Sequence, residues 1–169
     1  SIPFEGTTYK VTRIGYRAFY NCDGLTAVSL PGTVTSIGTD AFSDCDGLTA
    51  MELPASVKAI ENNAFYCCRN LASITLPEGL TSMGIQCFAN SGLNTVNLPS
   101  TLEAIPENAF INCEKLLSVK IPVGIKSIGK FAFSSCVRLT SIVIPEGLTS
   151  IPERCFNGCT ELASVSLPS

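Results

Sequence analysis

Histidine is absent from this chain of 169 residues. Its absence removes the commonest general base, the usual partner of a nucleophilic serine or cysteine, and the commonest nitrogen ligand of zinc. No run approaches the roughly 20 consecutive apolar residues that a membrane-spanning helix needs, so we expect no membrane insertion. The opening SIPFEGTTYK lacks the charged-then-apolar pattern of a signal peptide, so we expect that any export signal has been removed or omitted.

Charge of one sign is also scarce. Charged residues make up 15% of the chain, and 11 basic against 14 acidic side chains leave a net charge of −3. Because nucleic-acid binding needs a basic stripe, this composition argues against a nucleic-acid partner. Hydrophobic residues make up 46% of the sequence, which is ample to bury a core and argues against disorder.

What the sequence does contain is a repeat. The heptapeptides LTAVSLP, LTAMELP, LASITLP, LNTVNLP, LLSVKIP, LTSIVIP and LASVSLP begin at leucines spaced 23 residues apart five times and 22 residues apart once. The seven leucines are Leu25, Leu48, Leu71, Leu93, Leu116, Leu139 and Leu162. A second ladder keeps step with them: Phe19, Phe42, Phe65, Phe88, Phe110, Phe133 and Phe156. Two ladders in one register exclude coincidence and predict a stack of coils.

Two further apolar ladders accompany the phenylalanines. Five residues before each phenylalanine stand Ile14, Ile37, Ile60, Met83, Ile105, Ile128 and Ile151. Immediately before each stand Ala18, Ala41, Ala64, Cys87, Ala109, Ala132 and Cys155. Every copy thus supplies the same apolar set, so we expect the ladders to form one continuous core.

Each copy predicts a short strand, a turn and a second extended segment. In the first copy, apolar Val28 and Leu30 alternate with Ser29 as in a strand with one buried face, and Pro31 ends the strand because it lacks an N–H donor. A turn such as PGTV follows, and then a short apolar segment such as VTSI on the opposite wall. The next stretch, such as GTDAFSDC, predicts a single helical turn with its phenylalanine pointing inward.

The repeat pattern L-x-x-[VI]-x-[LI]-P-x-x-[LVI]-x-x-I-[GP]-x-x-A-F-x-x-C resembles the BspA-like class of leucine-rich repeats, also called the Treponema pallidum type. The match covers essentially residues 10 to 169, and TTYKVTRIGYRAF resembles the first copy of such arrays. The resemblance implies an α/β repeat solenoid, a right-handed coil with parallel strands on the concave wall and with short extended segments and single helical turns on the others. We expect one domain over residues 1–169, with seven repeats of about 23 residues.

The resemblance also implies a role. Such proteins are mainly secreted or surface-attached proteins of bacteria and some mucosal protists, and they adhere to host matrix proteins such as fibronectin or to other microbes. The motif residues are structural, so no functional residue carries over to this chain. We expect no catalytic residue, no metal and no cofactor.

Six of the nine cysteines stand three residues after a ladder phenylalanine, and Ser91 takes this place in the fourth copy. The six are Cys22, Cys45, Cys68, Cys113, Cys136 and Cys159. We expect buried, reduced thiols that close a corner of the coil and make weak hydrogen bonds. Disulfides or a metal column are the alternatives, but rungs ~4.8 Å apart hold the Cβ atoms too far apart for a relaxed disulfide, and a straight column does not converge on a metal. Cys67 stands outside the ladders and is expected to be the accessible thiol.

The fourth copy is one residue short between Phe88 and Leu93, at the place where cysteine becomes serine. One interpretation is a retightened turn in which Gly92 relieves backbone strain. The alternative is a functional dent in the surface.

Outward strand positions form the candidate binding row on the expected concave side. This row is Ser29, Glu52, Thr75, Asn97, Lys120, Val143 and Ser166, and beside it run Ala27, Ala50, Ser73, Thr95, Ser118, Ser141 and Ser164. Both rows are mostly small or uncharged and lack the Trp, Tyr and Arg of strong binding sites. The alternative is therefore that they are ordinary solvent-facing sheet residues.

Charges of mixed sign concentrate on the turn edge, and we expect them to form a solvated face that keeps the chain soluble. They include Asp40, Asp44, Asp46, Glu61, Arg69, Glu107, Glu114, Lys115, Lys130, Arg138, Glu153 and Arg154. Catalytic carboxylate pairs, nucleophile motifs and phosphate loops that depart from the repeat are absent. A glycan site would want exposed aromatic residues, and Tyr16, Tyr20 and Tyr66 are few and scattered in the sequence.

The ends suggest a longer array. The chain stops at LPS after its seventh predicted strand, and the opening SIP resembles the tail of a preceding strand. Because bare solenoid ends expose strand edges, we expect a fragment that associates end to end. The sequence favours a non-enzymatic binding or adhesion module, with a structural spacer as the alternative and a glycan-binding module as a third hypothesis.

Overall fold

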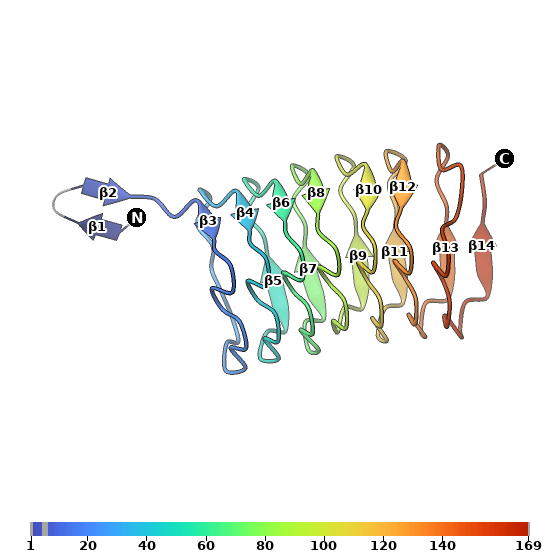
Figure 1. The fold of residues 1–169 in the computed structure, drawn as a ribbon, viewed down its shortest axis with the longest axis horizontal. Coiled ribbons are helices and arrows are strands. Elements are labelled where there is room, and N and C mark those ends of the chain that lie inside the picture. The colour runs from blue at the N-terminus through green and yellow to red at the C-terminus, as the bar shows by residue number, and fades with distance from the viewer. Residues whose placement is uncertain (1, 5–6, 169) are drawn as a thin grey trace.

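The computed structural model describes residues 2–4 and 7–168 of the chain. It shows a solenoid of about seven turns, in which short parallel strands of successive coils lie side by side (Figure 1). The order of the coils in space follows their order in the sequence. The stack predicted from the ladders is therefore the observed architecture.

The heptapeptides form a row of three-residue strands. They are β5 (Ala50–Glu52), β7 (Ser73–Thr75), β9 (Thr95–Asn97), β11 (Ser118–Lys120), β13 (Ser141–Val143) and β14 (Ser164–Ser166). β5 pairs with β7, β9 with β11 and β13 with β14, all parallel and in the register of the repeat. Six of the seven predicted strands form, whereas residues 27–29 of the first copy lie outside any strand.

A second row of two-residue strands lies on another wall of the coil. β3 (Arg13–Ile14), β4 (Ser36–Ile37), β6 (Ala59–Ile60) and β8 (Ser82–Met83) form one parallel sheet, and β10 (Ala104–Ile105) pairs with β12 (Ser127–Ile128). The second extended segment thus forms a strand at six of its seven positions, whereas residues 150–151 lie outside any strand. Figure 1 draws β5, β7 and β9 paler than β3, β4 and β6, which places the two rows at different depths.

The first residues do not continue the parallel stack. β1 (Ile2–Phe4) pairs antiparallel with β2 (Thr7–Tyr9), in a hairpin ahead of the first coil. The interpretation of SIP as the tail of a parallel solenoid strand is therefore wrong for Ile2 and Pro3, while Ser1 lies outside the described residues.

The Ala-Phe corner is not helical, which corrects the predicted single helical turn. Over residues 2–4 and 7–168 the structure contains strands and turns but no helix. In the second coil, Asp40 and Asp44 flank the Ala-Phe pair with φ of 53° and 58°, in the left-handed region that interrupts a right-handed helix. Every corner has two such residues, spaced four positions apart.

Hydrogen bonds explain this corner. The Phe42 N–H donates to the Ala64 carbonyl of the next coil at 2.8 Å, while the Ala41 N–H donates within its own coil to Gly38 at 3.1 Å. Successive N–H groups thus donate alternately to carbonyl groups of the next coil and of their own coil. A helical turn would direct its bonds along the chain, so the alternation joins coils at the expense of the helix.

Phenylalanines fill the centre of the stack. Phe42, Phe65, Phe88, Phe110 and Phe133 are fully buried, as are most members of the leucine and alanine ladders. Neighbouring rings stack with centroids 5.0 to 5.6 Å apart and with planes 2° to 10° from parallel. This spacing lies in the favourable range for aromatic pairs and confirms the predicted core.

Candidate functional site

The predicted binding row lies on one surface, which we call the strand face. All seven residues, Ser29, Glu52, Thr75, Asn97, Lys120, Val143 and Ser166, are exposed. Sheet pairing sets Glu52 beside Thr75 and Asn97 beside Lys120. Between them, Met51 and Val96 are buried, so the period-2 alternation directs one residue inward and the next outward.

The companion row is exposed as well and consists of Ala, Ser and Thr. Their small side chains leave the strand face shallow. One hollow of about 270 Å³ opens on it, lined by Ser29, Glu52 and Pro54 together with Val28 and Leu30. Two of the seven predicted residues therefore share a concavity.

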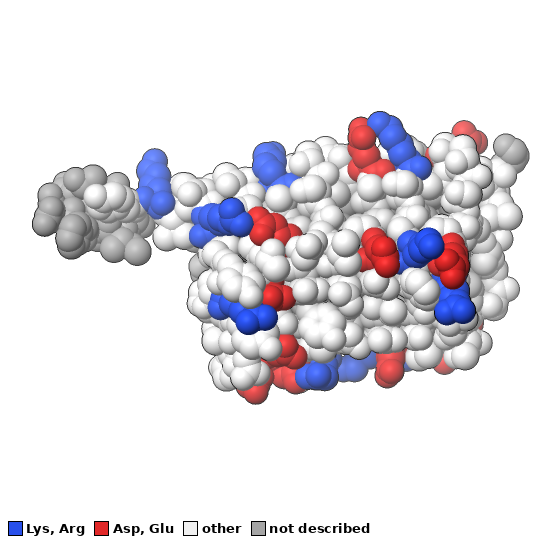
Figure 2. All heavy atoms as spheres, in the orientation of Figure 1, with Lys and Arg blue, Asp and Glu red and all other residues white. Residues whose placement is uncertain are grey.

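Charges on the turn edge are paired from coil to coil. Arg17 Nε lies 3.1 Å from Asp40 Oδ2, and Arg69 Nη1 lies 2.9 Å from Asp46 Oδ2. Lys130 Nζ lies 3.0 Å from the carboxylate of Glu153. Figure 2 shows basic and acidic side chains next to one another on the face toward the viewer.

These pairs are mostly exposed, so each contributes little to stability. The Lys130 ammonium, through its hydrogen bond, holds the pKa of Glu153 below its usual value. The mixed signs match the predicted solvated face. Asp40 departs from that prediction because it is buried, with 9% of its surface exposed.

The cysteine column makes cross-coil hydrogen bonds. All nine cysteines are unpaired. The Cys68 Sγ donates to the Phe42 carbonyl at 3.0 Å, and the Cys113 Sγ donates to the Phe88 carbonyl at 3.1 Å. The column prediction is confirmed for these thiols, which tie each corner to the coil before it. Ser91 stands in the same column with its Oγ 3.3 Å from the Cys113 Sγ.

Burial makes these thiols poor nucleophiles. Loss of solvent raises the pKa of Cys68 to about 12 and the pKa of Cys113 to about 11. Cys67 was expected to be accessible, but only 6% of its surface is exposed, and burial raises its pKa too. The prediction was wrong because Cys67 is one of the left-handed corner residues, and its N–H donates to the Ala89 carbonyl of the next coil at 2.9 Å, so it lies against that coil. A reactive thiolate needs the opposite surroundings.

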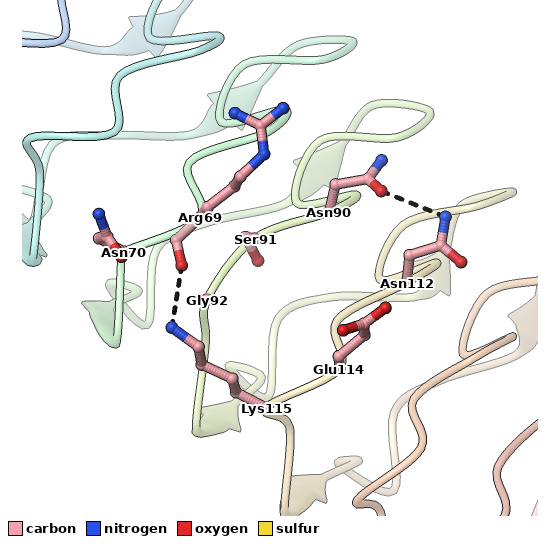
Figure 3. A pocket seen from close by; sticks show the side chains of 8 residues that line it. All are labelled: Arg69, Asn70, Asn90, Ser91, Gly92, Asn112, Glu114 and Lys115. Carbon is pink, nitrogen blue, oxygen red and sulfur yellow. Dashed lines mark hydrogen bonds between the residues drawn. The ribbon is translucent and has the colours of Figure 1, made fainter.

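The shortened fourth copy forms a hollow of about 290 Å³ on the turn edge. Figure 3 shows the shortened segment between its two neighbouring coils, with Arg69 and Asn70 on one side and Asn112 and Glu114 on the other. A hollow therefore lies at the shortened copy, and a function for it stays a prediction. Two hydrogen bonds join its lining residues: Asn112 donates to Asn90 at 3.2 Å, and the Lys115 ammonium donates to the Arg69 carbonyl at 3.2 Å.

Gly92 has a different role from the one predicted. Its φ lies outside the positive region, so no left-handed strain is relieved there. A Cβ at this position would instead collide with the Arg69 carbonyl, and the Gly92 N–H donates to the Cys68 carbonyl at 3.0 Å. Close approach of two coils, rather than backbone strain, requires glycine in the shortened copy.

The structure gathers tyrosines that are scattered in the sequence. The Arg17 guanidinium lies 5.0 Å from the centre of the Tyr16 ring and 4.9 Å from that of Tyr20. Tyr20 and Tyr66 line one hollow of about 200 Å³. This cluster was not predicted from the sequence, although Tyr20 and Tyr66 both directly follow a ladder phenylalanine.

Residues 2–4 and 7–168 lack two features that other kinds of site would need. No three His, Cys, Asp or Glu side chains come together there as metal ligands would. The described part of the chain also has no helix with the length and apolar character to span a membrane.

Several solved structures share this fold. A leucine rich cell surface protein from Faecalibacterium prausnitzii superposes with a TM-score of 0.71 and 29% identity, over 99% of this chain and 59% of its own. The Treponema pallidum leucine rich repeat protein superposes with a TM-score of 0.64 and 29% sequence identity, over 76% of this chain and 72% of its own. A leucine-rich repeat protein from Bacteroides ovatus superposes with a TM-score of 0.55 and 25% sequence identity, over 93% of this chain and 56% of its own.

The chain spans less than two thirds of the length of the Faecalibacterium and Bacteroides proteins. No curated protein matches it. The family model for the BspA type leucine rich repeat region matches in six copies, over residues 5–116 and 81–169. These matches span nearly the whole repeat array, and the chain therefore belongs to the BspA-type leucine-rich repeat family.

Proposed function

We propose that this chain is a non-enzymatic binding module of a bacterial surface or secreted protein, and that its strand face adheres to a host matrix protein or another macromolecule. The observation that carries the proposal is the candidate row itself. Its seven residues are all exposed, and the repeat register aligns them along one side of the stack. An extended surface of this kind suits a large partner better than a small molecule.

Three further observations support a binding role over catalysis. The Cys68 and Cys113 thiols are buried and protonated, because burial raises the pKa of both. Many of the turn-edge charges are paired across coils. The similar protein from Faecalibacterium prausnitzii is a cell surface protein, which supports a surface location for this chain.

A structural spacer is the second candidate. The shallow companion row of Ala, Ser and Thr favours it, because strong protein-binding sites are rich in Trp, Tyr and Arg. A spacer would hold another part of the protein away from the cell, and its strand face would bind nothing.

Interferometry separates the two candidates. The chain is tested against immobilised fibronectin and a panel of other matrix proteins, alongside a variant with Glu52, Asn97 and Lys120 all changed to serine. The expected result is saturable binding that weakens at least about tenfold in this variant.

The matched control changes Glu103, Lys126 and Asn157 to serine. It removes the same three residue types and keeps the same net charge. Glu103 and Lys126 form an ion pair 2.8 Å apart, so changing both leaves neither charge without its partner. Full binding by this control and weak binding by the strand-face variant support the proposal. Equal binding by both variants would place the site elsewhere. No detectable binding to any protein of the panel would favour the spacer.

A further inference from the structure

The hollow between Tyr20 and Tyr66 is built from one register position of successive coils. Tyr20, Ser43 and Tyr66 each directly follow a ladder phenylalanine. Ser43 is buried, with 2% of its surface exposed, so a small residue separates two tyrosines. Two rungs of the stack span roughly 10 Å, which leaves room for one small ring above the serine. The resulting hollow has a volume of about 200 Å³, below that of a drug-sized pocket.

Polar groups from neighbouring coils complete the hollow. Asp44, Asn63 and Gln86 line it, and all three have φ between 54° and 58°. Ser43 donates to Asp44 Oδ2 at 3.0 Å, which fixes the orientation of that carboxylate. Each amide offers one acceptor and two donors, and the carboxylate offers acceptors. The lining thus combines aromatic surface with several groups that can bind hydroxyls.

The charges around the hollow select against a charged ligand. Arg17 binds Asp40 at 3.1 Å and lies 4.9 Å from the centre of the Tyr20 ring. It therefore already occupies the aromatic face that would attract a cation, and its own charge would repel one. Asp44 would repel an anion. A neutral ligand with many hydroxyls meets neither repulsion.

Tyr66 is held in place before any ligand binds. Its side chain is half-buried, so part of the ring is fixed against the coil. Preorganised aromatic surface costs less entropy on binding than a mobile side chain does.

We infer that this hollow is a glycan-binding subsite that holds one neutral pyranose ring. The apolar face of the sugar packs on Tyr20 and Tyr66, and its hydroxyls bind Asp44, Asn63 and Gln86. The subsite lies on the corner of the coil and uses no residue of the strand face. If the strand face does not bind a partner, the glycan subsite can still exist. If the subsite does not bind a sugar, the adhesion proposal for the strand face is unaffected.

Nuclear magnetic resonance titration of the full chain tests the inference. The probes are the methyl glycosides of glucose, galactose, mannose and N-acetylglucosamine, each added up to about 100 mM. A single sugar ring has few atoms, so the expected dissociation constant for at least one probe is in about the millimolar range. The backbone amide signals of Asn63, Tyr66 and Gln86 should shift along one saturable curve.

Two tyrosine variants give the matched comparison. Tyr66→Ser copies the serine that the second coil carries at the same register position, so the corner should fold as it does there. Its affinity for the sugar should fall at least about tenfold. Tyr16→Ser removes an exposed tyrosine outside the hollow lining and should leave the affinity within about twofold.

Charged probes provide the opposing outcome. N-acetylneuraminic acid and N-acetylarginine amide are titrated at the same ionic strength. The inference is overturned if either binds these residues more tightly than every neutral sugar. Flat titrations for all four glycosides, or unchanged binding by Tyr66→Ser, overturn it as well.

Discussion

At the scale of single residues, the corner depends on backbone angles that most side chains avoid. Thirteen non-glycine residues have φ between 53° and 59°, and seven of them are Asn or Asp. Those two residue types tolerate the left-handed region better than other non-glycine residues do. The remaining corner residues therefore carry conformational cost that a substitution can relieve.

Ser135 offers such a substitution. Its φ is 59°, and at the same register position of the two preceding coils Asn112 donates to Asn90 at 3.2 Å. Ser135→Asn should raise the free energy of unfolding by about 1 kcal/mol, because asparagine suits the angle and can extend the amide ladder. Urea denaturation measures the change. Ser135→Ala serves as control and should give no gain, and an equal gain in both variants would contradict the explanation.

The buried thiols predict a loss of stability in alkali. Burial raises the pKa of Cys113 from 9.0 to about 11, so the unfolded chain releases this proton first as the pH rises. The stability that the buried, protonated thiol contributes is complete well below the pKa of the unfolded chain. It is lost as the pH rises from that value to and through the pKa of the folded chain. One such thiol should lower the free energy of unfolding by about 1.4 kcal/mol between about pH 8 and pH 10.

Denaturation of Cys113→Ser at the two pH values tests this effect. Serine keeps a donor for the Phe88 carbonyl, and the fourth copy already carries Ser91 in the same column. The alkaline loss should be about 1.4 kcal/mol smaller in the variant than in the parent chain. Identical losses in the two proteins would show that Cys113 is not protected from ionisation.

At the scale of the coil, the phenylalanine ladder carries much of the packing. Phe110 is fully buried, and its ring lies 5.5 Å from that of Phe88 and 5.4 Å from that of Phe133. Removing one ring from the middle of this column leaves a cavity with close-packed walls on both sides. Coils at the end of the stack have a neighbour on one side only in the described structure.

Phe110→Ala should therefore lower the free energy of unfolding by about 3–5 kcal/mol. Phe156→Ala makes the same chemical change in the last coil, where the ring is half-buried and, among the described residues, stacks only on Phe133. Its cost should be clearly smaller. Thermal and urea denaturation of the pair measure both costs, and equal destabilisation would contradict the central position of Phe110.

Local patterns in the sequence predicted the strands well. The alternation of Val28, Ser29 and Leu30 recurs in each heptapeptide, and exposure of the whole candidate row follows from it. Such alternation is a property of neighbouring residues, so one copy suffices to identify it. Whether the exposed row binds a partner is a separate question, and it stays a prediction.

The corner was harder to predict because its hydrogen bonds are not local. The Phe42 N–H binds a carbonyl 22 residues later, and nothing in GTDAFSDC alone distinguishes that bond from a helical one. Asp40 and Asp44, four positions apart, were the available signal for two left-handed residues. The same corner buries Cys67 and places Tyr20 and Tyr66 around one hollow, and neither arrangement is visible in a single copy of the repeat.

At the scale of the whole molecule, the solenoid is held together by contacts between neighbouring coils. Each coil buries its apolar set only against the coils beside it, so stability depends on every junction. Strand pairs, thiols and corner N–H groups all contribute bonds across these junctions. The strand face and the tyrosine hollow both exist only because successive coils keep their register.

Hydrogen exchange at the corner amides tests this account most directly. The N–H groups of Phe42, Phe65, Phe88, Phe110 and Phe133 each donate to the next coil at 2.8 to 3.0 Å. They should exchange as slowly as the most protected strand amides, because only separation of the coils exposes them. Fast exchange at these five positions, as expected for the unpaired first turn of a helix, would contradict the account.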